Sequence, residues 1–162
     1  MPAVPSPSEI EPSVRQAIDS FLARQHYYPC LLLVHLDPAR LERVAGELAT
    51  AYGWPRVEVG RELSAALLAE PPAQYPGQAR RWLAGRLRAL APGPALVTGV
   101  DLLLEPALDV EPLLLLRRAS RTTRLVVTWP GAYERGVLSY GVPQHAHYRT
   151  WAHPEVAVVA LT

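Results

Sequence analysis

The segment CLLLV at residues 30–34, followed by HLDPARLERVAGELATAYG at residues 35–53, decides the fold class. An unbroken apolar run of this length is typical of a strand that is covered on both faces in a parallel sheet. Asp37 and Pro38 then form a helix start signal, because aspartate caps the first turn and proline fits its first position. Apolar residues recur at helical spacing up to Gly53, a plausible C-cap. The sequence therefore predicts a buried strand followed at once by an amphipathic helix.

The same alternation of strands and helices continues along the chain. Further strands are expected at residues 56–59, 95–98, 125–129 and 156–161. Further helices are expected from residue 12 to before Pro29, and at residues 61–70, 78–90 and 113–119. Pro130 and Gly131 are expected to end the strand at 125–129. A hairpin is then expected over residues 132–140, turning at Arg135 and Gly136, with an apolar edge at 137–140 open to another strand.

This order predicts an α/β three-layer sandwich around a mostly parallel sheet, with a C-terminal β-hairpin and a final strand. Residues 1–10 are rich in Pro, Ser and Ala and are expected to form a flexible tail, and residues 11–162 a single domain. Apolar runs are too short to span a bilayer, and no secretory leader is recognisable, so a cytoplasmic protein without a membrane partner is expected. The single cysteine, Cys30, is expected to be a buried thiol.

Charge and composition exclude several classes of protein. Sixteen basic residues against fifteen acidic ones give the 162-residue chain a net charge of +1, which argues against a surface built wholly for nucleic acid. All sixteen are arginine, and the chain contains no lysine. A standard P-loop, a protein kinase and a serine/lysine nucleophile pair each need a lysine, so these are excluded in their standard forms.

The turn after the first strand is where doubly wound folds bind phosphate. It contains no glycine between residues 31 and 45, and Asp37 would place a carboxylate on the helix N-terminus, where it repels phosphate. A connecting turn is therefore favoured over a divergent nucleotide site that uses Arg40 or Arg43. At the end of the strand at 95–98, Thr98 stands where nucleotide hydrolases hold an acid for magnesium. Asp101 and Glu105 follow it in the chain, as a catalytic pair or as solvated acids.

Two other groups of residues are candidates for binding. His145, His147 and His153 would suit a metal in spacing, but a surface loop with incidental histidines is favoured, and no metal is expected. Two clusters of arginines could bind a nucleic-acid backbone. The alternative interpretation is that they form a solvated helix face or a protein interface. The first comprises Arg117, Arg118, Arg121 and Arg124, and the second Arg80, Arg81, Arg86 and Arg88.

The order of several segments resembles BrxF, the small P-loop-type protein of type 3 BREX phage-exclusion systems. The most distinctive is VTWPGAYERGVLSY at residues 127–140, which runs on to Pro143, His145, Tyr148 and Arg149. The others are VEVGRELS at 57–64, EPP at 70–72, VDLLL at 100–104 and DVEPL at 109–113. The resemblance covers roughly residues 29–161 and implies a RecA/AAA-like core. It also implies a role in phage defence beside a BREX methyltransferase, a helicase and a PglZ-type protein.

The same resemblance implies that the nucleotide site is degenerate. The family's Walker A loop aligns with residues 35–43, which lack its glycines and its lysine, and the Walker B acid falls at Thr98. No nucleotide-binding residue carries over to this region, which comprises His35, Asp37, Arg40, Thr98 and Asp101.

These observations predict a non-catalytic subunit, without a cofactor, that acts through contacts with other defence proteins. Homo-oligomers are an open alternative. A nucleic-acid-binding accessory protein that uses Arg117, Arg118, Arg121 and Arg124 is one alternative. A divergent ATPase is another, and an enzyme that uses Asp101, Glu105 or the histidines is a third.

Overall fold

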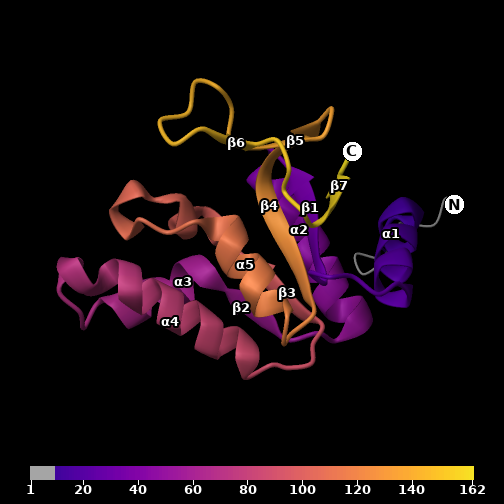
Figure 1. Ribbon diagram of the computed structural model, residues 1–162. Coiled ribbons are helices and arrows are strands. Elements are labelled where there is room, and N and C mark those ends of the chain that lie inside the picture. Colours follow the sequence, from indigo (N-terminus) through magenta and orange to yellow (C-terminus); the bar gives the residue numbers. More distant parts are fainter. Residues whose placement is uncertain (1–9) are drawn as a thin grey trace, which may run out of the picture.

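A computed structural model describes residues 10–162, and in that part of the chain a seven-stranded sheet carries helices on both faces (Figure 1). The α-helices are α1 (Pro12–Ala23), α2 (Pro38–Tyr52), α3 (Val59–Leu67), α4 (Tyr75–Arg88) and α5 (Pro112–Ser120). The strands are β1 (Cys30–His35), β2 (Arg56–Glu58), β3 (Ala95–Thr98), β4 (Leu125–Glu134), β5 (Val137–Tyr140), β6 (Arg149–Trp151) and β7 (Ala157–Ala160). Short 3-10 helices are η1 (Pro72–Gln74), η2 (Val100–Leu104) and η3 (Pro106–Leu108).

The main sheet is parallel and has the order β2-β3-β4-β1-β7. In the register, Cys30 lies opposite Leu125 of β4, and Leu31 lies opposite Ala157 of β7. The far half of β4 leaves the parallel sheet and pairs antiparallel with β5, which in turn pairs with β6. The predicted α/β architecture with a mostly parallel sheet and a final strand is therefore confirmed.

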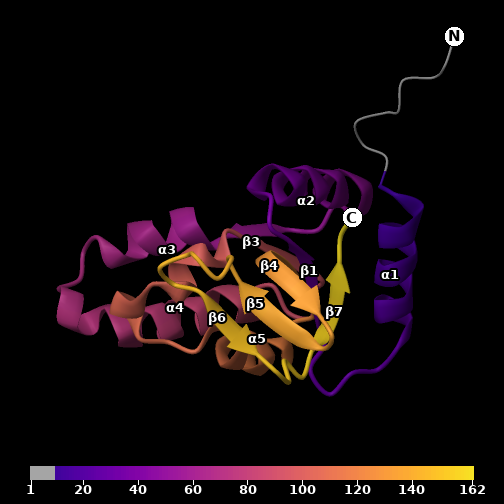
Figure 2. The same cartoon turned by 90° about the horizontal axis from the view of Figure 1, so that it is seen from above.

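Strand β1 lies between two hydrophobic cores. Its side chains alternate: Cys30, Leu32 and Val34 face the core formed with α3, α4 and α5, whereas Leu31 and Leu33 face α1 and α2. All five residues are at most 1% exposed, and the two layers of helices are seen on opposite sides of the strands in Figure 2. Burial raises the pKa of the Cys30 thiol to about 12, so the thiol stays protonated at neutral pH.

The N-terminal boundary of the domain lies earlier than predicted. Of the expected tail, residues 1–9 lie outside the described residues, but Ile10 is buried. Its side chain joins Val14, Ile18 and Phe21 of α1 in the core on that face of the sheet. The assignment of residue 10 to a tail is therefore wrong, because Ile10 continues the apolar face of the helix.

Strand β4 does not end at Pro130 and Gly131, as the sequence had suggested, but continues to Glu134. Pro130 still accepts a hydrogen bond at its carbonyl, from Gly141 N at 3.1 Å. The absence of a side chain at Gly131 lets β5 approach closely, since a Cβ there would lie 1.8 Å from the carbonyl oxygen of Ser139. The hairpin itself is confirmed, with Arg135 and Gly136 both at positive φ in its two-residue turn.

The expected open edge at residues 137–140 is wrong, because β5 is paired on both sides, by β4 and by β6. Strand β6 is only three residues long and has no apolar alternation that would have predicted it. Its own residue Trp151 attaches it to the core, because the Trp151 ring contacts the buried ring of Trp129 edge-on at a centroid distance of 5.4 Å. The indole nitrogen of Trp129 donates to the carbonyl of Ser139 at 2.9 Å.

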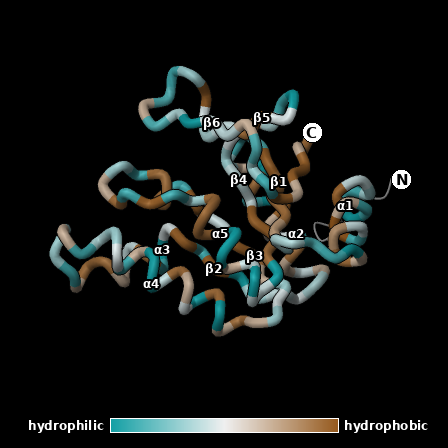
Figure 3. The backbone as a smooth tube through the Cα atoms, in the orientation of Figure 1, coloured by the Kyte–Doolittle hydropathy of each residue, from teal (hydrophilic) through white to brown (hydrophobic). Residues whose placement is uncertain are grey.

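Hydrophobic residues colour much of the central strands in Figure 3, whereas the helices alternate between the two colours along their length. This is the pattern of amphipathic helices that cover a buried sheet. Within residues 10–162, no helix has the length and apolar character needed to cross a membrane.

Helices α3 and α4 begin two and three residues earlier than the predicted positions 61 and 78. The start of α3 is set by Glu62, whose carboxylate accepts a hydrogen bond from Glu58 N at 2.7 Å. Glu62 also pairs with Arg86 of α4 at 2.9 Å and so ties the two helices together. Burial alone would raise the pKa of Glu62. The hydrogen bonds from Arg86 and Glu58 N and the charges of Arg86 and Arg61 outweigh burial, and the pKa is lowered.

Gly131→Ala is expected to destabilise the protein by about 3 kcal/mol or more, because the added methyl group overlaps the backbone of β5. Gly85→Ala in α4 is the matched control, since a Cβ there has no neighbour within 4 Å. The control is expected to be neutral or to stabilise by up to about 1 kcal/mol. Urea unfolding followed by tryptophan fluorescence measures both, and equal effects would contradict the close approach of β4 and β5.

Glu62→Gln is expected to cost about 1 kcal/mol at pH 7. Because the folded-state pKa of Glu62 is lowered, the stability from its charge is complete above the unfolded pKa of about 4.3. It is lost as the pH falls through the folded pKa. The gap between wild type and variant should therefore narrow when urea unfolding is repeated in steps from pH 7 to pH 3.5. A gap that stays constant would show that the charge does not stabilise the fold.

Candidate functional site

The turn between β1 and α2 is closed by its own side chains. Asp37 Oδ1 accepts a hydrogen bond from Ala39 N at 2.9 Å, and Asp37 N donates to His35 Nδ1 at 2.9 Å. Pro38 at the first helical position has no N–H to offer. The predicted cap is therefore confirmed. It places a negative charge where a phosphate would need free amides.

Arg40, considered as a phosphate ligand in the divergent-site interpretation, does not line a cavity at the ends of the strands. Its side chain is only 8% exposed, and its Nη2 pairs with Glu11 at 3.0 Å. Its Nε donates to the carbonyl oxygen of Thr162 at 3.3 Å. Arg40 thus joins α2 to the residue before α1 and to the residue two positions after β7, which is a structural role.

A cavity of about 280 Å³ lies where β2 and β3 end and α2 and α3 begin, beside Thr128 and Pro130 of β4. A chain of ion pairs lines it: Arg56 binds Glu42 at 2.5 Å and Glu58 at 3.6 Å, and Glu58 also pairs with Arg61. The hydrogen bond with Glu42, helped by the charges of Glu42 and Glu58, raises the pKa of Arg56 despite partial burial. Arg56 is therefore a permanent cation at this edge of the sheet.

Thr98 is the partner of that cation. Its hydroxyl accepts a hydrogen bond from Arg56 Nε at 3.2 Å and lies 3.5 Å from the carbonyl of Val57, to which it donates. Thr98 therefore holds a guanidinium and is not the carboxylate with which nucleotide hydrolases hold magnesium. The sequence pointed to Thr98 but not to Arg56, because nothing local marks a residue whose partner is 42 positions away.

Asp101 and Glu105 line different cavities. Both belong to the segment around η2, but Asp101 lines the cavity beside Arg56, whereas Glu105 lines a different one. Burial of the phenol, together with the nearby charges of Asp101 and Glu105, raises the pKa of Tyr140. The two carboxylates therefore act on one neutral tyrosine and do not face each other across a single cavity.

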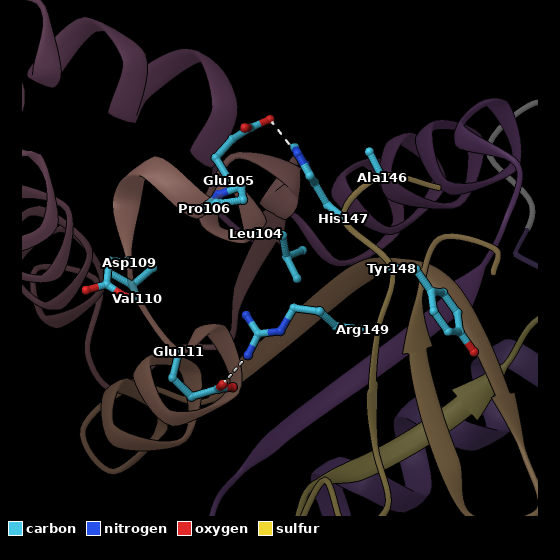
Figure 4. Close-up of a pocket in the computed structure, with 10 residues that line it drawn as sticks. All are labelled: Leu104, Glu105, Pro106, Asp109, Val110, Glu111, Ala146, His147, Tyr148 and Arg149. Carbon is cyan, nitrogen blue, oxygen red and sulfur yellow. Dashed lines mark hydrogen bonds and ion pairs between the residues drawn. The ribbon is translucent and has the colours of Figure 1, made fainter. Parts of the chain in front are cut away.

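The second cavity is larger, about 610 Å³, and lies between the segment that leads into α5 and the loop that leads into β6 (Figure 4). Two contacts join these segments: His147 Nδ1 lies 3.8 Å from a carboxylate oxygen of Glu105, and Arg149 forms an ion pair with Glu111 at 2.7 Å. Glu111 Oε1 also caps α5 by accepting from Leu113 N at 3.2 Å, and it accepts from the Trp151 indole at 3.1 Å. The carboxylate of Glu111 thus caps α5 and also binds two residues of β6.

Two of the three histidines have other partners in the structure. His145 Nδ1 accepts a hydrogen bond from His147 N at 3.0 Å, and its ring stacks edge-on against Tyr140. His147 is directed to Glu105. Among the residues that the structure describes, no three His, Cys, Asp or Glu side chains are grouped so as to hold a metal ion. The loop from 141 to 148 is a series of turns and not the extended chain in which the two histidines would share a face.

The first arginine cluster is divided by the structure. Arg121 donates to the carbonyl of Tyr27 at 2.7 Å and stacks on its ring, and Arg124 donates to the carbonyl of Leu22 at 3.2 Å. Arg117 donates to the carbonyl of Pro154 at 2.9 Å. Arg117 and Arg121 thus hold the β6–β7 and α1–β1 connections near α5, and Arg124 joins the end of α1 to the residue before β4. Arg118 is exposed and does not join them.

Comparisons with models of protein families, with curated proteins and with solved structures found no match.

Glu111→Ala is expected to destabilise the protein by about 2 kcal/mol, because it removes a helix cap, an ion pair and a hydrogen bond to Trp151 at once. Glu105→Ala is the matched control from the same cavity, since its longer contact with His147 is worth about 0.5 kcal/mol or less. Urea unfolding of both variants at pH 7 measures the difference. Similar losses would show that Glu111 does not link α5 and β6.

Proposed function

We propose that the protein is a non-catalytic subunit of a bacterial anti-phage defence complex of the BREX type, built on a P-loop-like fold whose nucleotide site has been lost. The observation that carries the proposal is the state of the carboxyl edge of the sheet. Asp37 caps α2 where a phosphate would bind, and Arg56 occupies the side of Thr98 where magnesium would bind. A phosphoryl-transfer site needs free amides for the phosphate and an acid for magnesium. Here the amides are met by the carboxylate of Asp37, and the acid is replaced by Thr98, which holds a guanidinium.

The resemblance to BrxF supports the defence context, and its residues have structural roles in this chain. The Trp-Pro-Gly segment forms the part of β4 where the strand passes from the parallel sheet to the hairpin. Arg149, to which the same stretch runs on, binds Glu111 of the DVEPL segment. The hairpin is therefore attached to α5 by residues that the resemblance includes.

A subunit without chemistry of its own acts through its surfaces, so the partners we propose are the other proteins of the defence system. The alternative of nucleic-acid binding through Arg117, Arg118, Arg121 and Arg124 receives less support. Three of these four donate to backbone carbonyls of the same chain. A guanidinium held in this way has fewer donors left for a phosphate backbone.

Isothermal titration of the purified protein with ATP and magnesium tests the lost site. No saturable heat is expected up to about 1 mM nucleotide, because the α2 N-terminus is capped and the adjoining cavity holds Arg56. Micromolar binding that disappears in Arg56→Ala would contradict the proposal. An established ATP-binding protein titrated in the same buffer shows that binding would have been detected.

Affinity purification of the tagged protein from its native cells tests the defence role. Co-purification with a methyltransferase, a helicase or a PglZ-type protein is expected, together with loss of phage resistance when the gene is deleted. Unchanged resistance and the absence of all three proteins would overturn the assignment.

A further inference from the structure

A groove between α4 and α5 differs from the other surfaces of the protein. It has a volume of about 290 Å³, an apolar floor and a basic rim. The floor is formed by Leu83, Ala84, Leu115 and Ala119, and the rim by Arg80, Arg88 and Arg118. The structure thus joins one arginine of the first cluster to two of the second, although they lie about thirty or more positions apart in the sequence.

The three rim arginines are available to a partner. All are exposed, and within residues 10–162 none of them forms an ion pair or a side-chain hydrogen bond. The part of the chain described places no acidic residue on the groove lining. This contrasts with Arg86 on the same helix, which is paired with Glu62. The groove therefore presents unbalanced positive charge above an apolar surface.

The spacing of the arginines matches that of charges on a helix. Arg80 and Arg88 are eight residues apart on α4, which corresponds to about 12 Å along the helix axis, with Ala84 on the same face between them. Carboxylates seven or eight residues apart on a second helix laid along the groove have nearly the same separation. Arg118 faces such a helix from the α5 side.

The apolar floor distinguishes between two acidic partners, a nucleic acid and an acidic amphipathic helix. Leu83 is 1% exposed and belongs to the core beneath the groove, and Leu115 packs against that core. A nucleic-acid backbone would use the rim but bring only phosphates and sugars to this floor. An amphipathic helix would cover the floor with leucine-like side chains and pair its flanking acids with the rim.

We propose that the groove between α4 and α5 binds an acidic amphipathic helix of a partner protein. The inference rests on the proposed function, because that function requires a surface for a protein partner. It adds which surface is used and which chemistry the partner brings.

Binding of a synthetic helix tests this directly. The probe is a fluorescein-labelled peptide of about 18 residues, with leucines at i, i+4 and i+7 and glutamates flanking them. Its anisotropy is measured during titration with the whole protein, and saturable binding is expected. The same peptide with glutamine in place of each glutamate is expected to bind at least about tenfold more weakly.

Two variants locate the binding to the groove. The triple substitution Arg80→Gln, Arg88→Gln, Arg118→Gln is expected to weaken binding at least about tenfold. Ala84→Glu, which places an acid on the floor, should do the same with only one exposed residue changed. The matched control replaces three exposed arginines elsewhere by glutamine, at Arg24, Arg43 and Arg135, and is expected to stay within about twofold of wild type.

Three results would overturn the proposal: no saturable binding up to about 100 µM protein, equal loss in the groove variant and the control, or displacement of the peptide by a micromolar duplex DNA of about 20 base pairs. The last result would assign the groove to nucleic acid. Unchanged circular dichroism and melting temperature are required of every variant. Co-purification of defence proteins without peptide binding would refute the groove alone and leave the proposed function standing.

Discussion

The complete burial of β1 is the constraint on which the rest of the structure depends. A strand in the middle of a parallel sheet must satisfy its backbone on both sides, and here β4 and β7 do so. Its side chains must also be covered on both faces, which requires α1 and α2 on one side and α3, α4 and α5 on the other. Once these elements surround β1, the carboxyl ends of β2 and β3 meet at one edge of the sheet, beside the middle of β4. There Arg56, Glu42 and Thr98 lie together.

Arginine does structural work in this chain that lysine would do less well. A guanidinium has several donors in a fixed plane. It can therefore donate to a carbonyl while it also binds a carboxylate or stacks on an aromatic ring. Arginines donate to main-chain carbonyls at four places: Arg40 to Thr162, Arg117 to Pro154, Arg121 to Tyr27 and Arg124 to Leu22. Each bond fastens a connection or a chain segment to a helix or to the start of β4. The lysine-free composition is consistent with a protein in which cations hold segments together, and only some of them are left exposed.

Local signals could be predicted from the sequence, and distant partnerships could not. The strand and cap around Asp37 and the turn at Arg135 and Gly136 depend on neighbouring residues, and the structure confirms them. Strand β6 and the cap at Glu111 were missed. The Glu111 cap had a local signal, an acid directly before Pro112 that repeats the pairing at Asp37 and Pro38. Its contact with Trp151 spans 40 positions and had none. The candidate site follows the same division. The sequence pointed to Thr98 as part of the site, but it did not predict that Arg56 would bind the Thr98 hydroxyl.

The burial of Cys30 has a consequence for how motion in this protein can be followed. Its thiol lies in the central strand, is shielded on both faces and has no second cysteine in the chain to compete with it. An alkylating reagent can reach it only in molecules whose β1 has come away from its neighbours. The rate of alkylation therefore measures the opening of that one strand. The strand that separates the two cores carries its own chemical probe, placed there without any engineered label.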